Sequence, residues 1–110
     1  MSLADKIRKA REQVVPLGDF KFTIRRPTDV EMLELQGSSS VSRLFKFIVG
    51  WEGVKELDII AGGDPHPLAF DAEACREWLE DRPDLLGPVV STIVGSYSRH
   101  TEALEAAAKN

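Results

Sequence analysis

The stretch FKFIVGWEGVKEL, Phe45 to Leu57, decides most of the fold prediction for this sequence of 110 residues. Apolar side chains recur in and just before it at spacings of three and four, which predicts a helix that ends at Gly50. Trp51 follows directly, between Gly50 and Gly53. Because glycine permits a positive φ and a close backbone approach, we expect the indole to fold back at the helix end as part of the core.

The composition is that of an ordinary globular protein, with 43% hydrophobic and 29% charged residues. The length favours a single domain over residues 1–110, which is large enough to form a core without disulfides. A net charge of −4 argues against nucleic acid as the main partner, because phosphate contacts need clustered lysine and arginine. No apolar run is long enough for a membrane span, and the single cysteine, Cys75, suits a reducing cytoplasm.

The first segment predicts a helix over residues 2–15, capped by Ser2 and ended by Pro16 and Gly18. Its apolar stripe is thin, so we expect residues 1–18 to dock loosely on the rest of the chain. This first segment is basic, with Lys6, Arg8, Lys9 and Arg11. A later segment is acidic, with Glu73, Glu77, Glu80, Asp81 and Asp84. We interpret both segments as solvated helix faces in preference to a binding patch.

The next segment predicts a strand and a short helix. In FKFTIRR, residues 20–26, apolar and polar side chains alternate from Phe20 to Arg25, which is typical of a half-buried strand, and Pro27 would end it. Thr28 and Glu31 have the spacing of a capping box and predict a helix that starts there. Gly37 and the serines at positions 38–40 predict a loop and a second N-cap before the helix that ends at Gly50.

The C-terminal half predicts a hairpin and two helices. Residues 54–60 and 67–70 would pair across the turn-rich loop AGGDPHP, and Asp71 would cap the helix that follows. A long final helix is expected from Pro88, with a frayed end over residues 98–110. The chain is therefore predicted to be mainly α with a small β-hairpin, in the α+β class: a compact helical domain with one or two short strands.

The predicted core combines the strand, the large aromatic residues and the apolar stripe of the last helix. A tryptophan ring can bury on the order of 200 Å², so both tryptophans are assigned to the core rather than to a ligand-stacking site. The residues assigned are Phe22, Phe45, Ile48, Trp51, Trp78, Val90 and Ile93.

Few side chains suggest catalysis. His66 lies near three aspartates along the chain, but the prolines on both sides of it favour a turn over a metal site. Cys75 falls on an apolar helical face, where a small buried hydrophobe is favoured over a nucleophile. The pair Gly62-Gly63 is too short for a phosphate-binding loop. We predict no catalytic residue, no cofactor and no metal site.

Three pieces of sequence carry a family resemblance: GWEGV at Gly50–Val54, PLAFDAEACREWL at Pro67–Leu79, and the helix from Pro88. Together with the strand and capped helix before them, their order resembles the tail assembly chaperones of long-tailed bacteriophages and prophages, over residues 20–97. The resemblance implies a non-enzymatic protein of the host bacterial cytoplasm that binds the tape measure protein and keeps it soluble during virion morphogenesis. It also implies a longer, frameshifted form that reaches the tail tube protein. The loop AGGDPHP and the basic first segment depart from the family pattern.

Binding such a helical client needs apolar surface and reversible, multivalent contacts. The candidates lie on the thin stripes of the two terminal helices: Ile7, Val14, Tyr97 and Leu104. Loose docking of these helices is an equally weighted alternative, and the same faces could pair in a homo-oligomer.

Two further points bear on the function. Ala108-Lys109-Asn110 can be encoded by a slippery heptamer, which would suit the frameshifted form. The rival prediction is a structural virion protein, such as a head–tail connector or a tail completion component. Neither nucleic acid nor a membrane is expected as a partner.

Overall fold

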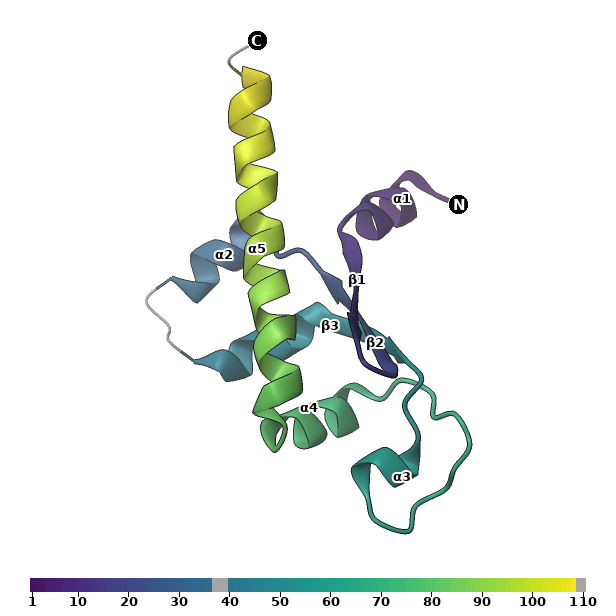
Figure 1. Ribbon diagram of the computed structural model, residues 1–110. Coiled ribbons are helices and arrows are strands. Elements are labelled where there is room, and N and C mark those ends of the chain that lie inside the picture. Colours follow the sequence, from purple (N-terminus) through teal and green to yellow (C-terminus); the bar gives the residue numbers. More distant parts are fainter. Residues whose placement is uncertain (37–39, 109–110) are drawn as a thin grey trace.

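The computed structural model describes residues 1–36 and 40–108 (Figure 1). Its centre is a three-stranded antiparallel sheet in the order β1-β2-β3, formed by Glu12–Leu17, Phe20–Arg25 and Ile48–Glu52. The helical elements are α1 (Leu3–Ala10), α2 (Asp29–Leu35), the 3-10 helix η1 (Val41–Phe47), α3 (Glu56–Ile59), α4 (Ala72–Glu80) and α5 (Pro83–Ala108). Helix α5 packs on β1 and β2, and α4 packs on β3. The chain is mainly helical with a small antiparallel sheet, which confirms the predicted class.

The first helix is shorter than predicted and is followed by a hairpin. Helix α1 ends at Ala10, and β1 pairs with β2 through a tight turn in which Gly18 has a φ of 61°. The prediction that Val14 lies on a helix is therefore wrong, because Val14 is on β1. Two consecutive valines favour a strand, and Pro16 is tolerated because β1 is an edge strand.

The helix predicted to end at Gly50 is also shorter than expected. The 3-10 helix η1 ends at Phe47, and the next five residues form β3, in which Trp51 pairs with Phe22. The placement of Trp51 at a helix end was wrong. Ile48 pairs with Ile24 in the same ladder, so pairing with β2 overrides the helical spacing of the apolar residues.

Between β3 and α4 the predicted hairpin does not form. Helix α3 and a loop occupy this segment, and only an isolated bridge joins Lys55 to Pro67. The loop is held to the sheet by Trp51, whose Nε1 donates to the carbonyl oxygen of Leu68 at 2.8 Å. Asp71 caps α4 as predicted, its side chain accepting from the backbone N–H of Ala74.

The last helix starts earlier than predicted. Helix α5 begins at Pro83 and continues through Pro88, so the predicted start at Pro88 is wrong. The physical reason is burial: Leu85, Val89 and Ile93 follow one face of the helix across the proline and are all buried. Pro83 suits the first position of the helix, because the backbone N–H that proline lacks would have no hydrogen-bond partner within the helix there.

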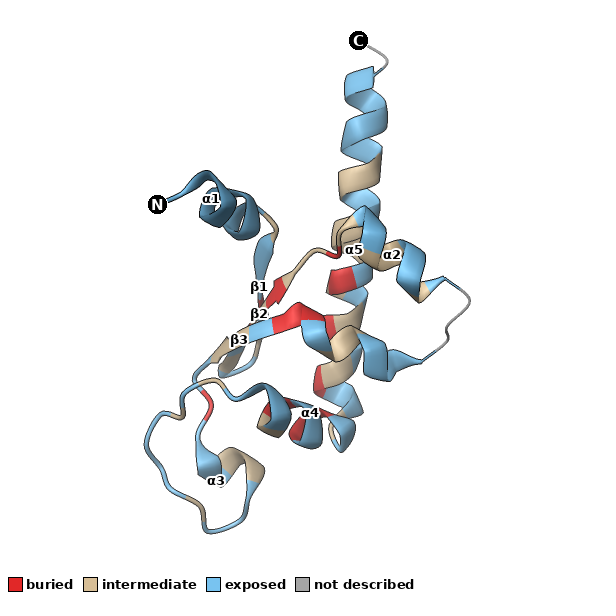
Figure 2. Ribbon diagram, turned by 180° about the vertical axis from the view of Figure 1, so that it is seen from behind, coloured by how far each residue is buried: buried red, intermediate tan, exposed pale blue. Residues whose placement is uncertain are grey.

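The core lies between the sheet and the helices α4 and α5 (Figure 2). Among the residues assigned to it from the sequence, Phe22, Ile48, Trp78 and Ile93 are buried. Phe45 and Trp51 are half-buried and pack against it, while Val90 is half-buried and its neighbour Val89 is fully buried. The ring of Trp78 meets those of Phe20 and Trp51 edge to face, with centroids 5.2 and 6.2 Å away.

Candidate binding groove

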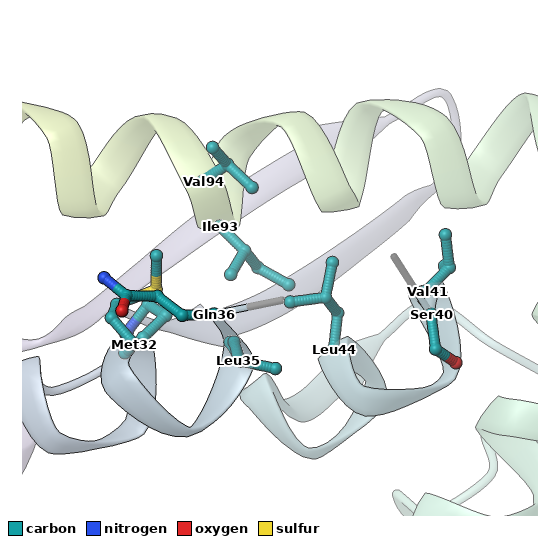
Figure 3. Close-up of a pocket in the computed structure, with 9 residues that line it drawn as sticks. Met32, Leu35, Gln36, Ser40, Val41, Leu44, Ile93 and Val94 are labelled. Carbon is teal, nitrogen blue, oxygen red and sulfur yellow. The ribbon is translucent and has the colours of Figure 1, made fainter. Parts of the chain in front are cut away.

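An open groove of about 260 Å³ lies between α2, η1 and α5 (Figure 3). Each element contributes apolar side chains to its walls: Met32 and Leu35 from α2, Val41 and Leu44 from η1, and Ile93 and Val94 from α5. Polar groups are few, and Gln36 and Ser40 stand at the ends of the elements that frame the groove. A concave surface of this chemistry suits an apolar side chain or the apolar face of a helix.

Several polar contacts hold α2, one wall of the groove, in place. Thr28 and Glu31 cap the helix reciprocally, as predicted. The Arg25 guanidinium binds the Glu31 carboxylate with two hydrogen bonds of 2.7 and 2.9 Å, and it lowers the pKa of Glu31 to about 2. The Tyr97 hydroxyl donates to Asp29 at 2.8 Å and ties the helix to α5. No α2 residue is fully buried, and Leu35 is half-buried against the core.

Several apolar side chains of the groove and of α2 are exposed. Val41 and Val94, which line the groove, are 44% and 48% exposed. Helix α2 additionally exposes Val30 and Leu33, each to 64%. Val30 and Leu33 do not line the groove, because the helical repeat places them on the side of α2 away from Met32 and Leu35.

The residues predicted to bind a partner lie on three elements, α1, β1 and α5. Ile7 is 45% exposed on α1, Val14 is 53% exposed on β1, and Leu104 is 55% exposed on the distal turns of α5. Tyr97 is half-buried, and its hydroxyl is engaged with Asp29. Sequence reasoning assigned Phe45 and Ile48 to the core and gave no role to Val41 or Leu44, which line the groove. The three-residue spacing of Met32 and Leu35 was the available signal for an apolar α2 face.

The side chains considered for catalysis lie in different environments. His66 is exposed, and its Nδ1 is 2.6 Å from a carboxylate oxygen of Asp64. Hydrogen bonds from the backbone N–H and the ring of His66 hold the pKa of Asp64 below its usual value. Cys75 is buried, and burial raises the pKa of its thiol to about 12. Within residues 1–36 and 40–108, no group of three or more His, Cys, Asp or Glu side chains is placed to hold a metal ion.

No protein-family model, curated protein or solved structure matches this chain. The family resemblance of the sequence thus remains a prediction. In the part of the chain that the structure describes, no helix combines the length and the hydropathy that a membrane crossing needs. The predicted loop at 37–39, and Lys109 and Asn110 of the frameshift prediction, lie outside the described residues.

Proposed function

We propose that this protein is a tail assembly chaperone of a long-tailed bacteriophage or prophage. In the host cytoplasm it binds the tape measure protein without catalysis and keeps it soluble until tube subunits assemble around it. The observation that carries the proposal is the open apolar groove between α2, η1 and α5. The client that the sequence resemblance implies is a long helix, and a groove of this kind accepts the apolar face of a helix.

The groove is shallow, which suits reversible binding of a client that must later be released. The groove is shallow enough to leave Val41 and Val94 half exposed, so one site buries only a few side chains of the client. Weak individual contacts give a high overall affinity when several copies bind along one long helix. The copies can still dissociate one by one when a competing protein binds the same helix. The groove therefore replaces the terminal-helix faces as the client site in this proposal.

The test is co-expression with the large protein encoded just downstream, followed by affinity capture and sizing. We expect that protein to become soluble only in complex with this one. Val94→Glu places a charge in the groove and should reduce capture at least tenfold, because an unpaired charge is costly to bury. Leu104→Glu is the matched control: its side chain is similarly exposed on the same helix, outside the groove.

The outcomes separate the alternatives. Loss of capture with Leu104→Glu alone would restore the terminal-helix face predicted from the sequence. Failure of the native protein to bind or solubilise its neighbour would overturn the chaperone proposal, and its recovery in purified virions would favour a structural virion protein. The codons for Ala108 to Asn110 show whether a longer form that reaches the tail tube protein can be made.

A further inference from the structure

Arginines without a carboxylate partner gather at one place on the molecule. Four of the eight arginines pair with an aspartate or a glutamate: Arg8, Arg25, Arg76 and Arg82. Within residues 1–36 and 40–108, the other four pair with no carboxylate: Arg11, Arg26, Arg43 and Arg99. Three of these four line a single open hollow of about 290 Å³, the arginine hollow, whose basic lining residues are Arg11, Arg26, Arg99 and His100.

Tertiary contacts bring the three arginines together from separate elements. Arg11 lies between α1 and β1, Arg26 follows β2, and Arg99 is on α5. The backbone N–H of Arg26 donates to the carbonyl oxygen of Arg11 at 2.8 Å, which holds these two residues side by side at one end of the sheet. Arg99 donates to the side chain of Gln13 at 3.0 Å and so joins α5 to β1. In Figure 1, α1 and the first residues of β1 stand across from the upper half of α5, and the hollow lies between them.

The protein leaves these cations incompletely satisfied. Arg11 is half-buried, and its Nε is buried without a hydrogen-bond partner. Arg26 donates to one backbone carbonyl oxygen at 3.0 Å, and Arg99 donates to Gln13. A guanidinium has five N–H donors, so most of the donors around the hollow have no acceptor in the described part of the chain. Because partial burial of an unpaired charge is costly, an anion in the hollow would offset that cost.

The acidic residue at the hollow does not supply this anion. Glu12 lines the hollow, but in the described part of the chain its side chain forms no ion pair and no hydrogen bond. Glu12 is exposed, and the strand alternation of β1 places it on the opposite face from Gln13, which contacts α5. The positive charge of the hollow is therefore not neutralised from within the chain.

The chemistry of the hollow fits carboxylate groups better than phosphate. A guanidinium presents its donors in a planar fork that matches a carboxylate, and Arg25 binds Glu31 in this way within the chain. Many phosphate sites use a glycine-rich loop, a helix N-terminus or a lysine, and the described residues that line the hollow include none of these. A net charge of −4 also disfavours the phosphate backbone of a nucleic acid.

We propose that the arginine hollow binds an acidic segment of a partner protein through its carboxylates. Three guanidinium groups exceed the charge of one carboxylate, so a segment with several acidic side chains fits better than a single free carboxylate. His100 is half-buried and adds a ring nitrogen that can donate to a carboxylate oxygen. The hollow and the groove share no lining residue, so this inference goes beyond the proposed function and does not depend on it.

The test is binding of a fluorescent oligoglutamate peptide to the purified chain, followed by anisotropy at low ionic strength. Arg99→Gln should weaken binding by about tenfold, because it removes charge-assisted hydrogen bonds. Arg99→Lys keeps the charge but loses the planar fork, so its affinity should lie between those of the native chain and Arg99→Gln. Arg43→Gln is the matched control, since Arg43 is also exposed and without a carboxylate partner but lies outside the hollow. It should leave the affinity unchanged.

Each outcome supports or overturns the proposal. Arg99 is exposed, so the variants should fold, and far-UV circular dichroism checks this. Equal losses with Arg99→Gln and Arg43→Gln would show only non-specific attraction and would overturn the proposal, as would a native chain that does not bind the peptide. Inorganic phosphate and a single-stranded DNA with the charge of the peptide are separate competitors. Displacement of the peptide by either one at a lower concentration than by unlabelled oligoglutamate would overturn the assignment to carboxylates.

Discussion

Replacing Trp51 by alanine should remove the main link between the sheet and the loop that leads to α4. The indole lies on β3, half-buried, and contacts the rings of Phe70 and Trp78 edge to face at centroid distances of 5.2 and 6.2 Å. Its Nε1 also donates to the carbonyl oxygen of Leu68 at 2.8 Å. One side chain thus joins β3 to segments 17 to 27 residues further along the chain.

The magnitude follows from these contacts. Half of a ring that can bury about 200 Å² contributes roughly 2.5 kcal/mol at about 25 cal/mol per Å². The hydrogen bond adds about 1 kcal/mol, and the two ring pairs add roughly 0.5 kcal/mol each. Trp51→Ala should therefore lower the free energy of unfolding by roughly 3–5 kcal/mol, the usual cost of truncating a large aromatic residue in a core.

Urea unfolding followed by far-UV circular dichroism measures this loss. With a denaturant slope of about 2 kcal/mol per M, the midpoint should fall by roughly 2 M. Trp51→Phe is the matched variant: it keeps most of the ring contacts and removes the donor to Leu68, so it should cost only about 1–2 kcal/mol. If Trp51→Ala is unfolded in buffer, Trp51→Phe still gives a measurable value. A loss below about 1 kcal/mol for Trp51→Ala would refute the reasoning, because the indole would then not anchor the loop.

Three further perturbations probe individual contacts. Hydrogen bonds from Arg25 lower the pKa of Glu31 from 4.5 to about 2, so ionised Glu31 stabilises the fold above pH 4.5, and this contribution is lost as the pH falls toward 2. Urea titrations over that range should show a steeper loss for the native chain than for Glu31→Gln; equal slopes would contradict this. Gly53 has a φ of +81°, and a Cβ there would lie 2.4 Å from the backbone oxygen of Asp19. Gly53→Ala should therefore cost roughly 2–3 kcal/mol, and more than Gly18→Ala, where space is open; equal costs would show that the clash is relieved. Burial raises the pKa of the Cys75 thiol from 9.0 to about 12, so a thiol reagent should label it only as the chain opens, and labelling at the rate of a free thiol would place it on the surface.

The sequence by itself determined the features whose causes are local. The alternation in FKFTIRR, residues 20–26, predicted β2, which ends one residue earlier, at Arg25. The capping box at Thr28 and the N-cap at Asp71 marked the starts of α2 and α4, because each depends on groups within three residues along the chain. The mainly helical class with a small sheet followed from the same signals.

The tertiary structure decided the features that depend on partners distant in sequence. Apolar residues around Ile48 fit a helical repeat and a strand equally well, and pairing with Ile24 on β2 selected the strand. Val14 and its neighbours likewise became β1 because the turn at Gly18 brings them against β2. The groove arises only when α2, η1 and α5 meet, so no single segment could show which apolar side chains remain uncovered. The spacing of apolar residues is a property of one stretch of chain. Whether each of these residues is buried depends on which other elements pack against it.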